Sequence, residues 1–369
     1  MQPQELAAGH PIFSTLHQWG SEGVPVDCGP DWEWDAVLAA VARSPHISAM
    51  DPANIPLVHE DVQYQVDAGF SKIVLWEDLK KLKPRKLKIS PIPVVPQKDR
   101  RGCLILDLSF PVYPKRTKSN PRPDPIQAGV NDTTVKLAPQ EPVREIGNVF
   151  RRVITLLDAV ELNEVVMLSK IDLSDGFWRM LVQEAEQVNF AYVMPDPPGS
   201  PICIVVPAAL QMGWAESPAY FCTATETARD IIQGLVADAV ELPPHCLEEY
   251  MRPKKAAKRS KSDSPGHGTY VDVDDFIGAA AENKNGTLLG RMTRGILHGI
   301  HSMFPSPAVT GHIGGKDPIS LKKLQRGDGQ WHHEKELLGF VVNGDTKTVC
   351  ILEAKSSDII QEIRRILKN

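Results

Sequence analysis

The fold is decided by the stretch Tyr270-Val271-Asp272-Val273-Asp274-Asp275-Phe276-Ile277-Gly278, an apolar run that contains two adjacent carboxylates. This pattern predicts two short strands joined by a tight turn, with Asp274 and Asp275 at or beside the turn. Two carboxylates in an apolar hairpin are costly unless a cation neutralises them. A divalent metal ion is the simplest such cation, although an isolated pair of aspartates is more often a solvated turn or a helix cap.

A second acidic stretch, 168–179, lies well upstream and contains Asp172. The apolar run 165–168 predicts a buried strand, which places Asp172 at the carboxyl end of that strand, where sheet-based sites are commonly built. If this strand and the 270–278 hairpin are neighbours, Asp172 and Asp274 can hold the same pair of magnesium ions. Two-metal sites of this kind clamp the attacking and leaving oxygens of an in-line phosphoryl displacement.

The segment 210–221 predicts the start of a helix. Ser217 is followed by a proline, so we expect Ser217 to cap free amides and the proline to occupy the first helical position. The helix should run to about Gln233 and end at Gly234. Gly213, just before the helix, allows the backbone to approach a ligand closely.

Basic residues gather around a predicted hairpin in the segment 90–108. Two apolar strands flank the polar turn 97–102, which presents basic side chains at its tip, an arrangement that suits a triphosphate. The whole chain carries a formal net charge of −5, yet the stretch 80–101 has nine Lys and Arg residues against the single acid Asp99. Such a stretch is the electrostatic footprint expected for a phosphate backbone, and a solvated lysine-rich face is the competing interpretation.

Four segments in this order resemble the reverse transcriptases, above all the polymerase of LTR-type and related retrotransposons. They are the basic hairpin, Asp-x-x-x-Gly-Phe from Asp172, Gly-Trp-x-x-Ser-Pro-x-x-Phe from Gly213, and Val-Asp-Asp from Val273; the segments 130–134 and 335–340 add to the likeness. The resemblance covers roughly residues 70–360. It implies an α+β, right-hand polymerase fold of fingers, palm and rudimentary thumb, with an antiparallel palm sheet backed by helices.

The resemblance also implies roles for individual residues. Asp172, Asp274 and Asp275 would be the catalytic, metal-binding carboxylates, and the Leu173 carbonyl an additional metal ligand. Two Mg²⁺ ions, with Mn²⁺ as a substitute, are the implied cofactors. The incoming nucleotide would be bound by Lys98, Arg101, Asp175, Gly176, Phe177 and Gly213, with the backbone amides of Asp175 and Gly176 directed at the triphosphate. Leu338, Gly339 and Phe340 would form the primer grip.

Phe177 has two readings. The resemblance places it where reverse transcriptases carry an aromatic side chain that clashes with a ribose 2′-hydroxyl, and the alternative is a core phenylalanine. Three lysines, Lys322, Lys323 and Lys335, are candidates for a general acid near the leaving pyrophosphate.

The chain departs from the pattern of the resembled polymerases at three positions. Met212 stands where the usual proline or glutamine precedes the glycine, with Gln211 one step earlier. Asp272 stands where most of them carry an aromatic residue, and its carboxylate either crowds the site or faces away. Cys103 stands where an arginine grips the triphosphate, and a shifted Arg100 or Arg101 rarely restores the bidentate geometry.

We divide the chain into an N-terminal extension (1–72), fingers (73–164), a palm with part of the fingers (165–345) and the start of a thumb or connection (346–369). Helices are expected near 32–42, 143–160, 287–303 and 359–367. Within the palm, about residues 252–266 are basic and poor in apolar residues, which predicts a flexible surface insertion. His298 and His301 in the 287–303 run favour a helix surface or core over a metal pair.

The leading functional expectation is therefore RNA-directed DNA synthesis, with a template-primer of RNA or DNA and deoxynucleoside triphosphates as partners. The alternative is a catalytically degenerate retroelement remnant that binds nucleic acid or protein. The six cysteines are scattered, which favours an intracellular, cytoplasmic or nuclear, chain without structural zinc or disulfides. No apolar run approaches the length that crosses a bilayer, so no membrane partner is expected. The oligomeric state stays open.

Overall fold

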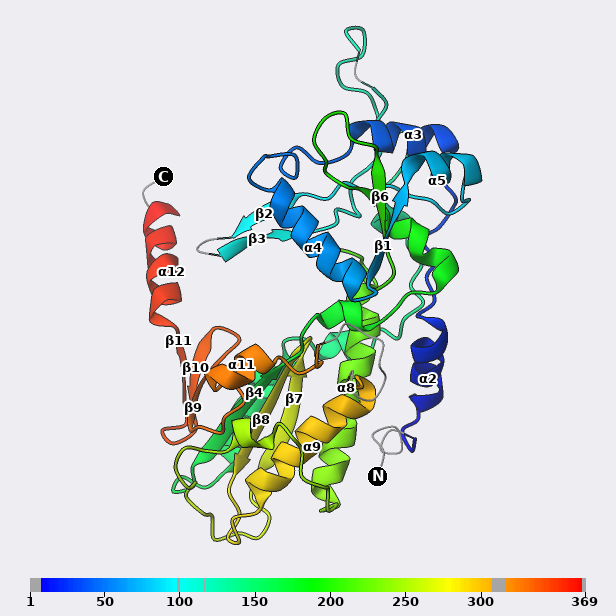
Figure 1. Ribbon diagram of the computed structural model, residues 1–369. Helices are drawn as coiled ribbons and strands as arrows, with labels where there is room; N and C mark the ends of the chain where they lie inside the picture. Colours follow the sequence, from blue (N-terminus) through cyan, green and yellow to red (C-terminus); the bar gives the residue numbers. More distant parts are fainter. Residues whose placement is uncertain (1–7, 98–99, 116, 307–315, 367–369) are drawn as a thin grey trace.

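The computed structural model mixes helices with antiparallel sheets and describes residues 8–97, 100–115, 117–306 and 316–366 (Figure 1). Among these residues, no helix is long and apolar enough to cross a membrane. All six cysteines have free thiols.

The central sheet consists of β4 (Val166–Asp172), β8 (Asp275–Ala281) and β7 (His267–Asp272), in the order β4-β8-β7, and both pairings are antiparallel. Every residue of the middle strand β8 is buried. Two helices, α8 (Ser217–Ala237) and α9 (Leu288–Met303), pack against each other and cover the sheet, and α7 (Asn148–Ala159) contacts β7 (Figure 1). Because β8 carries no polar side chain after Asp275, the middle of the sheet can be covered on both faces.

A second sheet has the order β1-β6-β5, built from β1 (Ser71–Leu75), β6 (Cys203–Pro207) and β5 (Tyr192–Val193). The separate hairpin of β2 (Val94–Gln97) and β3 (Arg100–Leu104) extends beside it. The helices of this part of the chain are α3 (Trp34–Arg43), α4 (Ile55–Asp67) and α5 (Trp76–Leu82), with α2 (Phe13–Glu22) before them and α6 (Val130–Thr133) after them.

The last part of the chain begins with α11 (Leu321–Arg326) and a three-stranded sheet. Its strands are β9 (Glu334–Leu337), β10 (Phe340–Asn343) and β11 (Thr348–Ile351), and α12 (Glu353–Ile366) stands away from the body after them (Figure 1). Short 3-10 helices cover Pro142–Glu145, Gly176–Arg179, Glu184–Phe190 and Glu248–Met251.

Most of the elements expected from the sequence form, with three corrections. Helix α8 does not end at Gly234 but continues to Ala237. The expected cap by Ser217 is wrong, because its hydroxyl donates to the Gln211 carbonyl at 2.8 Å and Glu216 is the residue at the N-cap. The expected helix over 143–160 is divided into Pro142–Glu145 and α7, because Gly147 between them has a φ of +83° that no α-helix contains.

The basic segment 252–266 is fastened to the central sheet at two points. Arg259 forms a strand-like bridge with Glu282, which follows β8, and the Lys258 ammonium donates to the Asn163 carbonyl at 2.7 Å. This segment therefore lies at the end of the sheet opposite the β7–β8 turn.

Candidate active site

Three carboxylates from two distant chain segments meet at one end of the central sheet. Asp172, the last residue of β4, lies directly opposite Asp275, the first residue of β8. Asp274 lies in the two-residue turn that joins β7 to β8, and its carbonyl accepts a hydrogen bond from the Leu173 N–H at 3.0 Å. The strand pairing expected from the sequence is thus observed, and it brings Asp172, Leu173, Asp274 and Asp275 together.

Two lysines neutralise part of this charge. The Lys323 ammonium of α11 forms an ion pair with the Asp172 carboxylate, and the Lys170 ammonium of β4 lies 2.7 Å from Asp275 Oδ2. The side chains of Asp172 and Asp275 are each only 12 % exposed. Both carboxylates are therefore largely shielded from water, and a charge interaction there is stronger than at the surface.

The remaining electrostatics show how crowded the acidic groups are. Burial and then the neighbouring Asp172 charge raise the pKa of Asp274 above its ordinary range. Burial also raises the pKa of Asp275 to about 6; the Lys170 ammonium opposes that rise, and the charges of Asp274 and Asp172 add to it. Both groups therefore release their protons reluctantly unless more positive charge is supplied.

The chemistry of the site fits hard divalent cations. Its donors are carboxylate oxygens, which Mg²⁺ and Mn²⁺ prefer. The buried Asp275 Oδ1 has no hydrogen-bond partner, so one acceptor of the cluster is left unsatisfied. In the present arrangement, no group of three or more His, Cys, Asp or Glu side chains within the described ranges is placed to hold one metal ion. Lys323 and Lys170 hold two of the three carboxylates instead.

The turn that carries Asp274 is strained. Val273 has a φ of +57°, a left-handed conformation that a β-branched residue rarely adopts. Such conformations are held only where the surrounding structure dictates them, and they are concentrated at functional sites. The turn therefore presents the Asp274 carboxylate from a fixed position between two paired strands.

Asp272 does not join the cluster. Its Oδ1 accepts a hydrogen bond from the Gly147 N–H at 3.1 Å, just before α7, and none of the raised pKa values at Asp274 or Asp275 is caused by it. Of the two readings of this departure from the reverse transcriptases, the structure favours the one in which Asp272 faces away.

The segment after β4 provides a second polar feature. Asp175 has a φ of +63° and begins the 3-10 helix Gly176–Arg179, and its Oδ2 accepts hydrogen bonds from the Tyr64 hydroxyl at 2.7 Å and from Arg179 at 3.3 Å. Among the residues that the structure describes, the N–H groups of Asp175, Gly176 and Phe177 donate no hydrogen bond. Those amides are thus free for an anion.

Phe177 and Gly213 pack against other parts of the protein. The Phe177 ring is half-buried and meets the Phe221 ring of α8 edge-on, with 5.1 Å between centroids. At Gly213, which has a φ of +105°, a Cβ would lie 2.5 Å from the Leu106 carbonyl oxygen. The close approach that requires this glycine is therefore to the segment after β3.

The tip of the β2–β3 hairpin is only partly described. Lys98 lies outside the described residues. Arg101 is held by α4, since its guanidinium lies 3.0 Å from a Glu60 oxygen and 2.9 Å from an Asp61 oxygen. Cys103 is half-buried, and burial raises the pKa of its thiol. The structure therefore does not direct Arg101 toward the carboxylates.

The late segments differ in their surroundings. Lys322 is exposed, whereas the Lys335 ammonium donates to the carbonyls of Gly327 and Asp328, and burial lowers the pKa of Lys335 to about 8. Leu338 and Gly339 both have positive φ and form the turn between β9 and β10. Phe340 follows that turn and packs edge-on against Phe150 of α7.

Two of the residues that shape the site were not expected from the sequence. Lys170 could have been found, because strand residues two apart share a face, so a lysine two positions before Asp172 points the same way. Tyr64 could not, because it lies 111 residues before its partner Asp175 in a helix with no distinguishing motif.

Comparison with known proteins gives structural neighbours only. No protein family matches the chain in sequence, and no curated protein matches it. It is similar to a solved foamy viral protease-reverse transcriptase dRH in complex with double-stranded DNA, with a TM-score of 0.48 and 15 % identity over 97 % of this chain. It is also similar to the foamy viral protease-reverse transcriptase with double-stranded DNA, with a TM-score of 0.45 and 17 % identity over 99 % of this chain. The chain spans 48 % and 60 % of the lengths of those proteins.

Proposed function

We propose that the chain is a reverse transcriptase-like polymerase that adds deoxynucleotides to a primer 3′-hydroxyl on an RNA or DNA template. The observation that carries this proposal is the convergence of Asp172, Asp274 and Asp275 at one end of an antiparallel sheet. Carboxylates from separate segments that meet at a strained turn are difficult to explain as a solvated surface feature, since burial and neighbouring charges raise the pKa values of Asp274 and Asp275.

In this proposal the three carboxylates and the Leu173 carbonyl hold two Mg²⁺ ions, or Mn²⁺ in their place. Such ions lower the pKa of the primer hydroxyl and stabilise the charge that develops as pyrophosphate leaves. The strained turn fixes the direction of Asp274, and the β4–β8 pairing fixes Asp172 opposite Asp275. The free amides of Asp175, Gly176 and Phe177 bind the triphosphate oxygens, with Asp175 oriented by Tyr64 and Arg179.

The lysines have a defined part in this scheme. Lys323 and Lys170 neutralise Asp172 and Asp275, and Asp172 would have to exchange its ion pair with Lys323 for a metal ion in order to act as a ligand. A displaced Lys323 stays on α11 beside the site, where its ammonium is positioned to protonate the leaving pyrophosphate.

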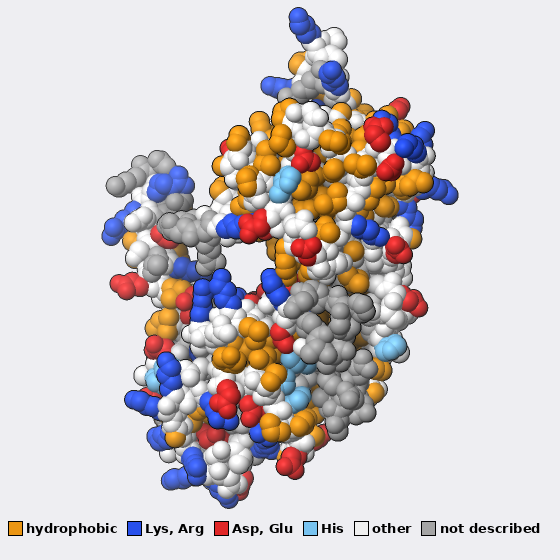
Figure 2. Space-filling model, in the orientation of Figure 1, with side chains coloured by type: hydrophobic (Ala, Val, Ile, Leu, Met, Phe, Trp, Pro, Cys, Tyr) orange, Lys and Arg blue, Asp and Glu red, His pale blue; other side chains and the backbone are white. Residues whose placement is uncertain are grey.

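Template and primer would lie along the hollow that Figure 2 shows between α12 and the body of the molecule, where Lys and Arg side chains gather on the rim. Fingers then correspond to the region around β2, β3 and the basic stretch 80–101, and palm to the β4-β8-β7 sheet. The β9–β10 turn with Leu338, Gly339 and Phe340 is the proposed primer grip. Counterion release from the template backbone would drive binding, so affinity should fall steeply with salt.

Primer extension tests the proposal directly. A labelled DNA primer on an RNA template is incubated with deoxynucleoside triphosphates and Mg²⁺ or Mn²⁺, with wild type, Asp274→Asn and Asp272→Asn in parallel. Wild type and Asp272→Asn should extend the primer, because Asp272 is directed at Gly147, whereas Asp274→Asn should not. Equal extension by wild type and Asp274→Asn would refute the assignment.

A second candidate function is supported by a specific observation. Two of the three carboxylates and Arg101 already have ion-pair partners without metal or triphosphate, and a cysteine stands at position 103. A retroelement remnant that binds nucleic acid or a partner protein would have these properties. Such a protein should bind primer-template with a strong salt dependence and show no metal-dependent gain in affinity for deoxynucleoside triphosphates.

A further inference from the structure

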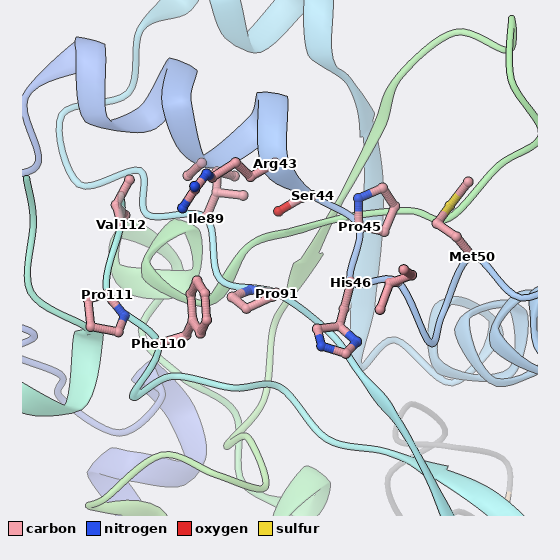
Figure 3. A pocket seen from close by; sticks show the side chains of 12 residues that line it. Arg43, Ser44, Pro45, His46, Met50, Ile89, Pro91, Phe110, Pro111 and Val112 are labelled. Atoms are coloured by element: carbon pink, nitrogen blue, oxygen red, sulfur yellow. The ribbon is translucent and has the colours of Figure 1, made fainter. Parts of the chain in front are cut away.

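A cavity of about 470 Å³ lies far from the carboxylate cluster, beneath α3 (Figure 3). It is bounded by the end of α3 and the segment 43–50 on one side, and by the extended segments 89–91 and 110–112 on the other. None of the residues assigned above to catalysis or nucleotide binding lines it. The cavity is therefore a separate feature of the part of the chain that carries the β1-β6-β5 sheet (Figure 1).

The walls of the cavity suit a flat apolar body. Ile89, Pro91, Val112 and Met50 contribute apolar surface, and the ring of Phe110 is 40 % exposed beside them (Figure 3). Phe110 is steadied by Tyr113, whose ring it meets edge-on at 5.9 Å. An exposed aromatic ring on the wall of a concave apolar site offers a stacking surface that water does not use.

Two hydrogen-bond donors at the cavity have no acceptor. Within the described part of the chain, Arg43 makes no ion pair or hydrogen bond, and its guanidinium carbon lies 5.5 Å from the centre of the Tyr113 ring. His46 Nδ1 lies 3.2 Å from the Ser48 backbone nitrogen and 2.8 Å from the Ser48 hydroxyl oxygen, which itself accepts from the Val94 N–H. With Nδ1 as the acceptor of both Ser48 groups, the proton of the neutral ring is on Nε2. That Nε2–H also has no partner among the described residues. Each donor is therefore open to an acceptor that a ligand brings, and an anionic acceptor suits the guanidinium best.

The surroundings of the cavity are positively charged. The segment that follows Val112 projects from the molecule and carries the exposed side chains of Lys115, Lys118 and Arg122, with Asp124 as its acid (Figure 2). A basic projection next to an aromatic-walled cavity is the combination that proteins use for single strands, because the charges follow the phosphates while unpaired bases stack. A duplex cannot use the cavity, since its bases are already stacked on one another.

We propose that this cavity binds one nucleotide unit of single-stranded nucleic acid. The base stacks on Phe110, a phosphate is bound by Arg43, and the His46 Nε2–H donates to an acceptor of the base or sugar. The neighbouring phosphates contact Lys115, Lys118 and Arg122. The inference rests on the proposed function only in taking nucleic acid as the partner. It requires neither metal nor catalysis, so Asp274→Asn should bind single strands as wild type does.

Fluorescence anisotropy with a labelled 12-nucleotide single strand and a labelled blunt duplex, without metal, tests the proposal. Phe110→Ala should weaken single-strand binding at least about fivefold, because one stacked base contributes that much or more to affinity. Duplex binding should stay unchanged. Phe110→Trp, which keeps an aromatic ring, should bind the single strand as wild type does. Arg43→Gln should weaken it and reduce the slope of log affinity against log salt by about one. Leu162→Ala and Arg151→Gln, which alter exposed side chains elsewhere, are the matched controls and should bind as wild type does.

A competition arm distinguishes a strand from a free nucleotide. Deoxyadenosine monophosphate should displace the labelled strand only weakly, because it lacks the phosphates that contact Lys115, Lys118 and Arg122. If deoxyadenosine monophosphate binds as tightly as the strand, and Phe110→Ala abolishes that binding, the cavity is a site for a free mononucleotide. The assignment to a single strand would then be wrong. Single-strand affinity unchanged in both Phe110→Ala and Arg43→Gln, or equally weakened in the controls, would overturn the proposal whatever primer extension shows.

Discussion

Replacing Asp275 with asparagine should make the metal-free protein more stable at neutral pH. The pKa of Asp275 rises from 3.8 to about 6 because burial penalises the charged carboxylate more than Lys170 stabilises it. A displacement of that size corresponds to about 3 kcal/mol of unfavourable ionisation in the folded state. Since asparagine has no charge to bury but also loses the contact with Lys170, we expect a gain of about 1–3 kcal/mol for Asp275→Asn at pH 7.5.

The pH dependence of this gain follows from its cause. A carboxyl whose folded pKa is raised binds its proton more tightly in the folded than in the unfolded protein, so the stability of wild type relative to Asp275→Asn should increase as the pH falls through about 6 toward 4. The gain is therefore largest above pH 7 and nearly absent at pH 4. Urea unfolding of both proteins in EDTA over pH 4–8 measures it, with the exposed Asp124→Asn as the matched control. A destabilised Asp275→Asn at pH 7.5, or a difference that does not vary with pH, would refute this reasoning.

Three further predictions concern other residues. Gly213→Ala should destabilise the protein by about 2 kcal/mol or more in urea unfolding, because the new Cβ meets the Leu106 carbonyl and the φ of residue 213 is +105°. Gly234→Ala is the matched control: it lies within α8 with nothing near its Cβ, and should stabilise the protein by about 0.5–1 kcal/mol. Burial and then the charge of His301 lower the pKa of His245 to about 4. Protonation of His245 should therefore reduce the free energy of unfolding of wild type by about 2 kcal/mol as the pH falls from 6.5 to 4, and urea unfolding of His245→Gln over the same pH range should show a smaller reduction. If Phe177 excludes a 2′-hydroxyl, Phe177→Ala should raise the ratio of ribonucleotide to deoxynucleotide incorporation in primer extension, and an unchanged ratio would mark it as a packing residue of Phe221.

The sequence predicts the local elements of the site well, because they depend on local patterns. The apolar residues on either side of the aspartate pair form β7 and β8 with the turn where it was expected, and Asp172 ends its strand as expected. These features follow from alternation and turn chemistry, which neighbouring residues determine. The positions of the β2–β3 hairpin and of α3 were also predicted from local patterns.

Features that depend on distant partners could not be predicted. Ser217 before a proline reads as a cap whether its hydroxyl faces the helix amides or, as here, the Gln211 carbonyl. Gly213 indicates that the backbone approaches another group closely, but the sequence does not identify that group, which is the Leu106 carbonyl. Lys323 was one of three candidate lysines, and only the tertiary contact of α11 with the end of β4 shows that it, and not Lys322, reaches Asp172.

Manganese binding to the carboxylate cluster is the measurement that tests the account most directly. Free Mn²⁺ is followed by electron paramagnetic resonance in titrations of wild type, Lys323→Gln, Lys322→Gln and Asp172→Asn. Lys323→Gln should bind Mn²⁺ about fivefold more tightly than wild type, since the competing ion pair at Asp172 is removed, while the exposed Lys322→Gln should match wild type. Asp172→Asn should bind at least about tenfold more weakly. Equal Mn²⁺ affinities in all four proteins would contradict the claim that Asp172, Asp274 and Asp275 form a metal site.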